Sequence, residues 1–231
     1  MWDVQVAALR EDVDHVLAPS LPGFGGTALP ERQPTMNDYA DALAAELDRA
    51  GVGRAVVVGL SMGGYVAFAM WRRHRDRISG LLLADTRADT DDESGRERRI
   101  KLAALVRERG TTALLLQPPK WVRDGSDRWE VVRALVARQP AEAIAQGSIA
   151  MAGRPSSVDT LPTIDVPTAV VVGADDEITP VAMSEAMASG IPGATLTVIP
   201  DAGHLANMDA PDEFDRTVRD LVRRVADREG R

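Results

Sequence analysis

The sequence predicts an α/β fold built on a mostly parallel sheet, and three observations support this prediction. Short runs of β-branched and aliphatic residues alternate along the chain with stretches of helical periodicity. One such run, residues 56–58, leads into Gly59-Leu60-Ser61-Met62-Gly63 and then into a helical pattern, as in a sharp strand-to-helix turn. The chain has 231 residues, 45% of them hydrophobic, which suffices for one domain with a sizeable core. Alternating strands and helices form βαβ units, whose strands lie parallel.

Composition narrows the classes of partner. A formal net charge of −8 disfavours a surface for nucleic acid or anionic membrane. The absence of cysteine excludes a disulfide framework, and no apolar run approaches the length of a membrane span. We therefore expect a cytoplasmic protein whose partner is a small molecule, not nucleic acid or a membrane. The sequence does not indicate an oligomeric state.

The elements before the serine are predicted from periodicity and turn residues. Residues 1–11 have an amphipathic helical pattern, and residues 15–19 are predicted to form a short strand. The Gly- and Pro-rich residues 20–27 form either a mobile turn or a loop that lines a site. Thr35 and Asp38 match a capping box, which predicts the start of a helix.

The elements after the serine suggest a helical insertion in the sheet. Residues 78–85 form an apolar strand, as expected for a parallel strand covered on both faces. Residues 87–161 are highly charged at first and then show helical patterning without a strand-like run, so we interpret them as a lid. The core is then residues 1–86 and 162–231. It is completed by strands at 168–172 and 195–199 and by helices beginning at Val181 and Pro211.

Ser61 is the candidate nucleophile. Its flanking glycines let the strand and helix backbones approach closely, and so tolerate a strained conformation at the serine. At the N-terminus of the following helix, the amide of Met62 would face negative charge that develops on a carbonyl oxygen. We therefore expect Met62 to supply one donor of an oxyanion hole.

A serine hydroxyl is a poor nucleophile at neutral pH, so a base must take its proton. Three histidines are available. His15 precedes a predicted strand, and His74 lies among arginines at a helix end. His204 follows the carboxyl end of a strand, at the sheet edge where Ser61 must also lie, so it is the predicted base.

A carboxylate usually orients such a base, and the residues alone leave its identity open. The turn that follows residues 168–172 also lies at the carboxyl end of a strand. The order serine, acid, histidine along the chain matches that of hydrolase triads. The turn offers Asp175, Asp176 and Glu177.

These stretches together resemble the α/β-hydrolase family, over nearly the whole chain. The resemblance implies that the triad acid is the aspartate three residues after Gly173, which is Asp176. Ser61, Asp176 and His204 then act as nucleophile, orienting acid and base. The pattern at 191–194, at 204–208 and at 152–155 is most similar to the branch that includes 3-oxoadipate enol-lactonase. The matching residues are Trp2, Gln5, Ala18-Pro19-Ser20-Leu21-Pro22-Gly23-Phe24-Gly25, Gly59-Leu60-Ser61-Met62-Gly63-Gly64, Gly173-Ala174-Asp175-Asp176-Glu177-Ile178-Thr179-Pro180 and Ala202-Gly203-His204.

One departure from the family concerns the N-terminus. Relatives carry additional strands there, one of which ends in a His-Gly loop that supplies the second oxyanion amide. That strand lies between those that correspond to residues 16–19 and 56–59. The resemblance thus implies an N-terminal truncation: either the native product begins upstream of Met1, or these two strands pair directly. With Met62 as the only donor, the barrier would rise by about 2.7–4 kcal/mol.

The sequence therefore predicts a serine hydrolase that cleaves a carboxylic ester or lactone of a small acid through an acyl-enzyme. Two alternatives stay open: an impaired hydrolase-fold protein that only binds a ligand, and an acyltransferase with the same triad. No cofactor is expected, and the lack of cysteine and scarcity of histidine disfavour a metal site. The candidate substrate-binding residues are Leu115, Trp121, Trp129, Met151 and Arg154, the last as a carboxylate clamp together with Arg87 and Arg123.

Overall fold

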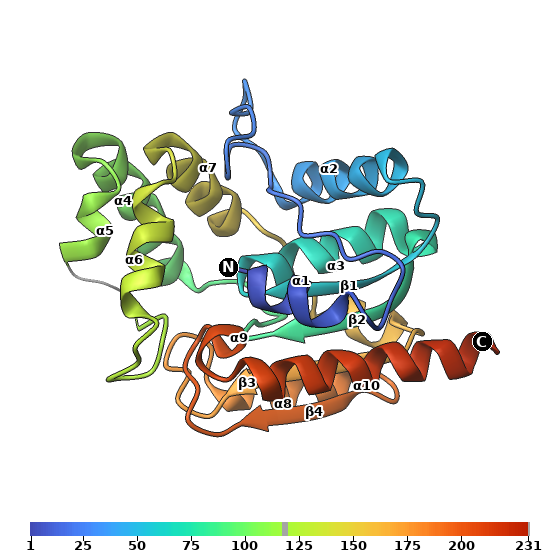
Figure 1. Ribbon diagram of the computed structural model, residues 1–231. Helices are drawn as coiled ribbons and strands as arrows, with labels where there is room; N and C mark the ends of the chain where they lie inside the picture. Colours follow the sequence, from blue (N-terminus) through green and yellow to red (C-terminus); the bar gives the residue numbers. More distant parts are fainter. Residues whose placement is uncertain (117–119, 231) are drawn as a thin grey trace.

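A parallel sheet forms the centre of the computed structural model, which describes residues 1–116 and 120–230. Within these residues the sheet has four strands in the order β1-β2-β3-β4, and every neighbouring pair is parallel. Helices cover both faces of this sheet (Figure 1). The predicted α/β fold is confirmed. The strands are β1 (Ala55–Leu60), β2 (Ile78–Ala84), β3 (Thr168–Gly173) and β4 (Thr195–Ile199).

Two apolar cores form because successive strand side chains point to opposite faces. Leu81 and Leu83 of β2 face the core with α2 (Met36–Arg49), α3 (Met62–His74) and α8 (Val181–Gly190). Leu82 faces the core with α1 (Asp3–Leu9) and α10 (Pro211–Glu229). β2 is therefore almost wholly apolar in sequence because both of its faces are buried.

The helical insertion lies between β2 and β3, where the sequence predicts it. Its helices lie to one side of the sheet in Figure 1. Its action as a lid stays a prediction. The insertion contains α4 (Glu93–Arg109), α5 (Thr112–Leu116), α6 (Trp129–Ala137) and α7 (Ala141–Ala152), and a short α9 (Ala206–Asp209) precedes α10.

The N-terminal segment differs from prediction in one respect. The predicted strand at residues 15–19 is wrong, because these residues form no strand. Among the described residues β1 pairs only with β2, so the alternative in which residues 16–19 pair directly with residues 56–59 is not the one observed. Pro19 and Pro22 lack the amide donors that a paired strand needs. The predicted capping box is confirmed: Thr35 caps α2, and its side chain and that of Asp38 each accept the other residue's amide.

Residues 20–34 instead pack along α7 of the insertion. The amide of Gly25 donates to Gln139 Oε1 at 3.0 Å, and Gln33 Nε2 donates to the carbonyl of Gln146 at 2.9 Å. Gln146 Nε2 returns a hydrogen bond to the carbonyl of Pro30 at 3.3 Å. These three hydrogen bonds therefore hold residues 20–34 against the insertion.

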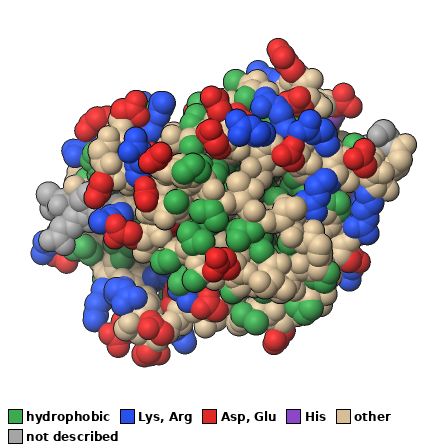
Figure 2. Space-filling model, turned by 90° about the horizontal axis from the view of Figure 1, so that it is seen from below, with side chains coloured by type: hydrophobic (Ala, Val, Ile, Leu, Met, Phe, Trp, Pro, Cys, Tyr) green, Lys and Arg blue, Asp and Glu red, His purple; other side chains and the backbone are tan. Residues whose placement is uncertain are grey.

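The surface of the protein includes exposed apolar side chains as well as charged ones. β4 is an edge strand of the described sheet, and Leu196 and Val198 on it are 37% and 41% exposed. Figure 2 shows hydrophobic side chains near the centre of the face seen from below, with charged side chains of both signs around them. In the described part of the chain, no helix combines the length and the apolar character that a membrane span requires.

Candidate active site

Ser61 lies on a strained turn between β1 and α3. Its backbone has φ 52° and ψ −114°, outside the regions that strands and helices occupy. A Cβ on Gly59 would lie 2.4 Å from the carbonyl oxygen of Gly63, so only glycine fits there. The predicted turn geometry is present, with the serine at the N-terminus of α3.

A side chain that the sequence did not single out supports this turn. Thr86 Oγ1 donates a hydrogen bond to the carbonyl of Ser61 at 2.8 Å, and the amide of Gly64 donates to the same oxygen at 2.9 Å. The amide of Ser61 donates to the carbonyl of Ala84 at 2.9 Å. The serine backbone is therefore fixed to the end of β2.

The structure brings together the three predicted catalytic residues. His204 Nε2 lies 2.8 Å from Ser61 Oγ, and His204 Nδ1 lies 2.9 Å from Asp176 Oδ2 and 3.1 Å from Oδ1. The imidazole and the carboxylate are both buried, whereas the neighbouring Asp175 is exposed. The three side chains come from segments that follow β1, β3 and β4, at the same edge of the parallel sheet.

The surroundings of Asp176 keep it ionised. Its Oδ1 accepts the amides of Ile178 and Thr179, and its Oδ2 accepts Thr179 Oγ1 at 2.6 Å. Burial raises the pKa of Asp176, but the hydrogen bond and charge of His204 and the bonds from Thr179 outweigh burial and hold that pKa below its ordinary value. A carboxylate only accepts, so Nδ1 carries the proton and Nε2 is left to accept from Ser61 Oγ.

Comparison with known proteins identifies the family. Residues 1–217 match the model of the family described as "Alpha/beta hydrolase family". The chain belongs to this family. This hydrolase is 26% identical over 230 residues to 3-oxoadipate enol-lactonase 2 of Acinetobacter baylyi, an alignment that covers 97% of this chain and 84% of that protein.

Solved structures resemble the hydrolase closely. A thermophilic esterase from Thermogutta terrifontis, with malate bound, matches with a TM-score of 0.92 and 38% identity over 97% of this chain and 85% of that one. The enol-lactonase from Burkholderia xenovorans LB400 matches with a TM-score of 0.85 and 30% identity over 96% and 85% of the two chains. The predicted family is confirmed, and enol-lactonases are among the hydrolase's relatives, as the sequence motifs predict.

The Gly- and Pro-rich loop of this hydrolase reaches the site. A Cβ on Gly147 of α7 would lie 3.3 Å from Cζ of Phe24 and 3.6 Å from Sδ of Met62. Phe24, Met62 and α7 therefore meet beside Ser61. Of the two sequence interpretations of residues 20–27, these contacts favour the loop that lines the site.

One of the predicted substrate-binding residues, Trp121, lies beside the histidine loop, and a second, Trp129, lies against Trp121. The carbonyl of Trp121 accepts the amide of Leu205 at 2.7 Å, directly after His204. The rings of Trp121 and Trp129 have centroids 6.0 Å apart. Leu115, by contrast, lies half-buried on α5. The insertion therefore contacts the base loop through Trp121.

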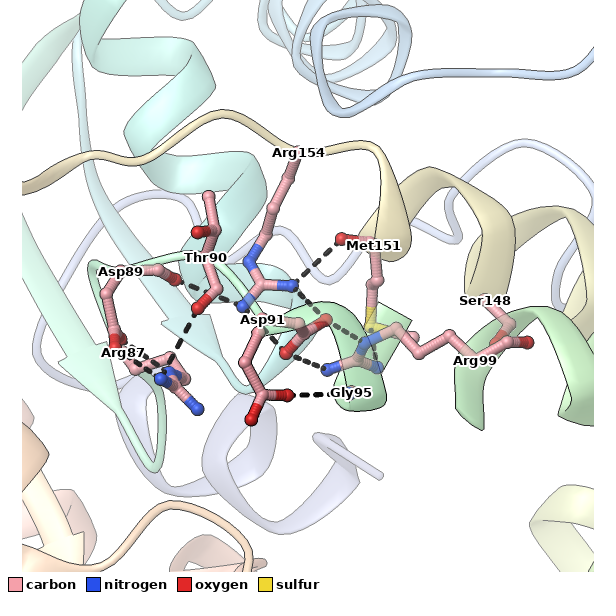
Figure 3. A network of polar contacts seen from close by, with 10 residues as sticks. Arg87, Asp89, Thr90, Asp91, Gly95, Arg99, Ser148, Met151 and Arg154 are labelled. Carbon is pink, nitrogen blue, oxygen red and sulfur yellow. Dashed lines mark hydrogen bonds and ion pairs between the residues drawn. The ribbon is translucent and has the colours of Figure 1, made fainter. Parts of the chain in front are cut away.

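The other two predicted substrate-binding residues, Arg154 and Met151, belong to a different site, the Asp91 cluster (Figure 3). We define this cluster as Asp91, Arg99, Met151 and Arg154. Arg154 makes two bonds to the Asp91 carboxylate, at 2.7 and 3.1 Å, and lies 4.1 Å over the ring of Tyr65. Arg99 bonds the same carboxylate and lies 3.2 Å from Sδ of Met151.

The Arg154 side chain is only 4% exposed. A guanidinium paired in this way is not free to bind a substrate carboxylate. Arg87 is likewise paired, with Asp89 beside the cluster, whereas Arg123 is exposed. The cluster joins the segment after β2 to α4 and α7, which is a structural role.

Proposed function

We propose that this hydrolase cleaves a carboxylic ester or lactone of a small acid through an acyl-enzyme formed on Ser61. The observation that carries the proposal is the unbroken chain of hydrogen bonds from Ser61 Oγ through His204 to Asp176. The names of the relatives, an esterase and two enol-lactonases, support the same class of substrate.

The geometry supports the following steps. Ser61 Oγ attacks the carbonyl carbon while His204 Nε2 takes the hydroxyl proton, and Asp176 remains ionised and stabilises the imidazolium. The negative charge moves to the carbonyl oxygen, toward the amide of Met62 at the start of α3. When the C–O bond to the leaving alcohol breaks, His204 returns its proton to that oxygen. Water then attacks the acyl-enzyme while His204 takes its proton, and when the bond between the acyl carbon and Ser61 Oγ breaks, His204 returns that proton to Oγ and the acid is released.

The residues around the nucleophile support a partly apolar acyl group. Phe24 and Met62 meet on one side, and Trp121 comes from the insertion beside the His204 loop. Aromatic and thioether side chains bind apolar groups through contact area and polarisable sulfur. We therefore expect esters with a short, apolar acyl group to be cleaved faster than esters with a charged acyl group.

Hydrolysis of p-nitrophenyl butyrate tests the proposal. We expect a burst of nitrophenol from the unsubstituted protein and labelling by a fluorophosphonate probe, because both report an acylated serine. Ser61→Ala should lower kcat on the order of 10⁶-fold and abolish labelling. Ser94→Ala, at an exposed serine of α4, is the matched control and should keep both. Absence of labelling in the unsubstituted protein would overturn the proposal in favour of a protein that only binds its ligand.

A further inference from the structure

A buried carboxyl group outside the proposed proton transfer lies at the end of β2. Asp85 is 0% exposed and directly follows the last residue of β2. β2 lies between β1, which leads to Ser61, and β3, which leads to the turn with Asp176. Asp85 therefore lies between the elements that carry the nucleophile and the acid.

Each carboxyl oxygen of Asp85 accepts a hydrogen bond from a different segment of the site. The amide of Gly173, which precedes the turn with Asp176, donates to Oδ1 at 2.9 Å. The amide of Ala206, which follows His204, donates to Oδ2 at 3.3 Å. One side chain thus links the acid turn, residues 173–179, to the base loop, residues 202–206.

The acid turn and the base loop also touch directly. A Cβ on Gly173 would lie 2.3 Å from the carbonyl oxygens of both Ala202 and Gly203, so only a glycine allows this approach. The amide of Asp175 donates to the carbonyl of Ala202 at 2.9 Å. With so little free space, a small shift of either segment moves the other. The two hydrogen bonds of Asp85 add a buried side-chain link to this direct backbone contact.

This environment is unfavourable for a carboxyl group. Burial raises the pKa of Asp85 well above its usual range, the amide of Gly173 opposes that rise, and the negative charges of Asp176 and Asp209 add to it. The backbone φ of 45° lies in the left-handed region, which Asp and Asn tolerate better than most residues. Strained, desolvated groups of this kind are concentrated at functional sites.

We propose that Asp85 is a positioning residue, whose carboxyl group holds the acid turn and the base loop at the separation that lets Asp176 orient His204. This inference rests on the proposed function and adds a residue outside the triad. Without both acceptors the loop shifts, the contact between His204 Nδ1 and Asp176 lengthens, and proton removal from Ser61 slows. Phe24 lies on a separate segment, against Gly147 of α7, so the substrate contact expected there remains.

Asp85→Asn tests this role at constant size, and Asn also tolerates the left-handed backbone. The side-chain amide of the introduced Asn places an N–H donor where one carboxylate oxygen was. The backbone amide of either Gly173 or Ala206 then faces a donor and loses its hydrogen bond. We expect kcat on the butyrate ester to fall on the order of 10²-fold with KM nearly unchanged. The acidic limb of the kcat/KM profile should move to lower pH, because a displaced Asp176 stabilises the protonated base less.

Val225→Ala is the matched control for stability. Val225 is buried on α10 against Gly80 of β2, remote from the carboxyl end of that strand. This variant should lower Tm while kcat and the acidic limb stay at the values of the unsubstituted protein. Equal behaviour of Asp85→Asn and Val225→Ala would overturn the positioning role.

Proton NMR reads the same contact without turnover. The Nδ1 proton of His204, bonded to a carboxylate, gives a downfield signal that His204→Gln removes. Asp85→Asn should shift or broaden this signal and Val225→Ala should not; an unchanged signal in Asp85→Asn contradicts the proposal. If Asp85→Asn does not fold, Asp85→Ser is measured in the same way. An unsubstituted protein that shows the signal but is not labelled would overturn the proposed function alone.

Discussion

The proposed triad of Ser61, His204 and Asp176 and the Asp91 cluster both bury a carboxylate against a nitrogen group, but only the imidazole of the first can gain and lose a proton near neutral pH. The side chains of Asp176 and His204 are 0% and 4% exposed, and those of Asp91 and Arg154 are 8% and 4% exposed. An imidazole can gain and lose a proton near neutral pH, whereas a guanidinium stays charged. With similar burial, the His204–Asp176 pair is suited to the proposed proton transfer, whereas the Arg154–Asp91 pair is suited to a permanent structural contact.

The position of each region agrees with this difference. The triad lies where the carboxyl ends of three strands meet, next to the start of α3. The Asp91 cluster lies where the insertion leaves and re-enters the core, and Arg154 packs on Tyr65 of α3. Changes in the triad should thus affect turnover, and changes in the cluster should affect stability.

The largest expected effect is on turnover, at Asp176. Asp176→Asn removes the charge that favours the Nδ1-protonated tautomer, and we expect kcat to fall on the order of 10⁴-fold on the butyrate ester. Asp175→Asn, at the exposed neighbouring residue, is the matched control and should leave kcat nearly unchanged. A comparable loss in the control would mean that the acid has been assigned to the wrong residue.

The next effect is on stability, at Asp91. Asp91→Asn leaves the buried guanidinium of Arg154 without its carboxylate, and we expect the free energy of unfolding in urea to fall by about 3–5 kcal/mol. Asp89→Asn removes a more exposed partner, that of Arg87, and should cost less than about 1 kcal/mol. If Asp91→Asn lowered kcat as Asp176→Asn does while the free energy of unfolding stayed the same, the structural role of the Asp91 cluster would be contradicted.

The smallest effect is the pH dependence of that stability. Burial raises the pKa of Asp91, but its bonds to Arg154 and Arg99 outweigh burial and hold the pKa well below its ordinary value. The pKa of Asp91 is lower in the folded protein than in the unfolded chain, where it is about 3.9. The stabilisation by this carboxylate is therefore fully present when the pH is above the unfolded pKa, and it is lost as the pH falls through the folded pKa. The difference in unfolding free energy between the unsubstituted protein and Asp91→Asn should therefore be smaller at about pH 3 than at about pH 7. A constant difference would contradict the assignment of the stabilisation to this carboxylate.

Local patterns predicted the four strands of the sheet and the turn that carries Ser61, because the signal for each lies within a few residues. Gly59, Ser61 and Gly63 determine the turn, and apolar runs gave strand bounds within one or two residues of those observed. The acid turn offered three carboxylates by pattern alone. Family resemblance selected Asp176, and the structure places that residue against His204.

Partners distant in sequence could not be predicted in this way. Residues 15–19 are apolar enough for a strand, but a strand also needs a neighbour, which a single run cannot reveal. The sequence favours a substrate role for Arg154 because its partner Asp91 lies in another segment, which no local pattern reveals. Thr86 and Asp85 follow the carboxyl end of β2, so their place at the sheet edge was the available signal for them.

The backbone of Ser61 has a consequence for how the free energy of this protein is distributed. A serine held at φ 52° destabilises the fold by about 1–3 kcal/mol, and this cost falls on folding rather than on each turnover. The contacts of Gly59 with Gly63 and of Thr86 with the Ser61 carbonyl keep the turn from relaxing. The proposed nucleophile is thus held in position before any substrate binds, and the packing of the two cores supplies the stability that offsets the strain.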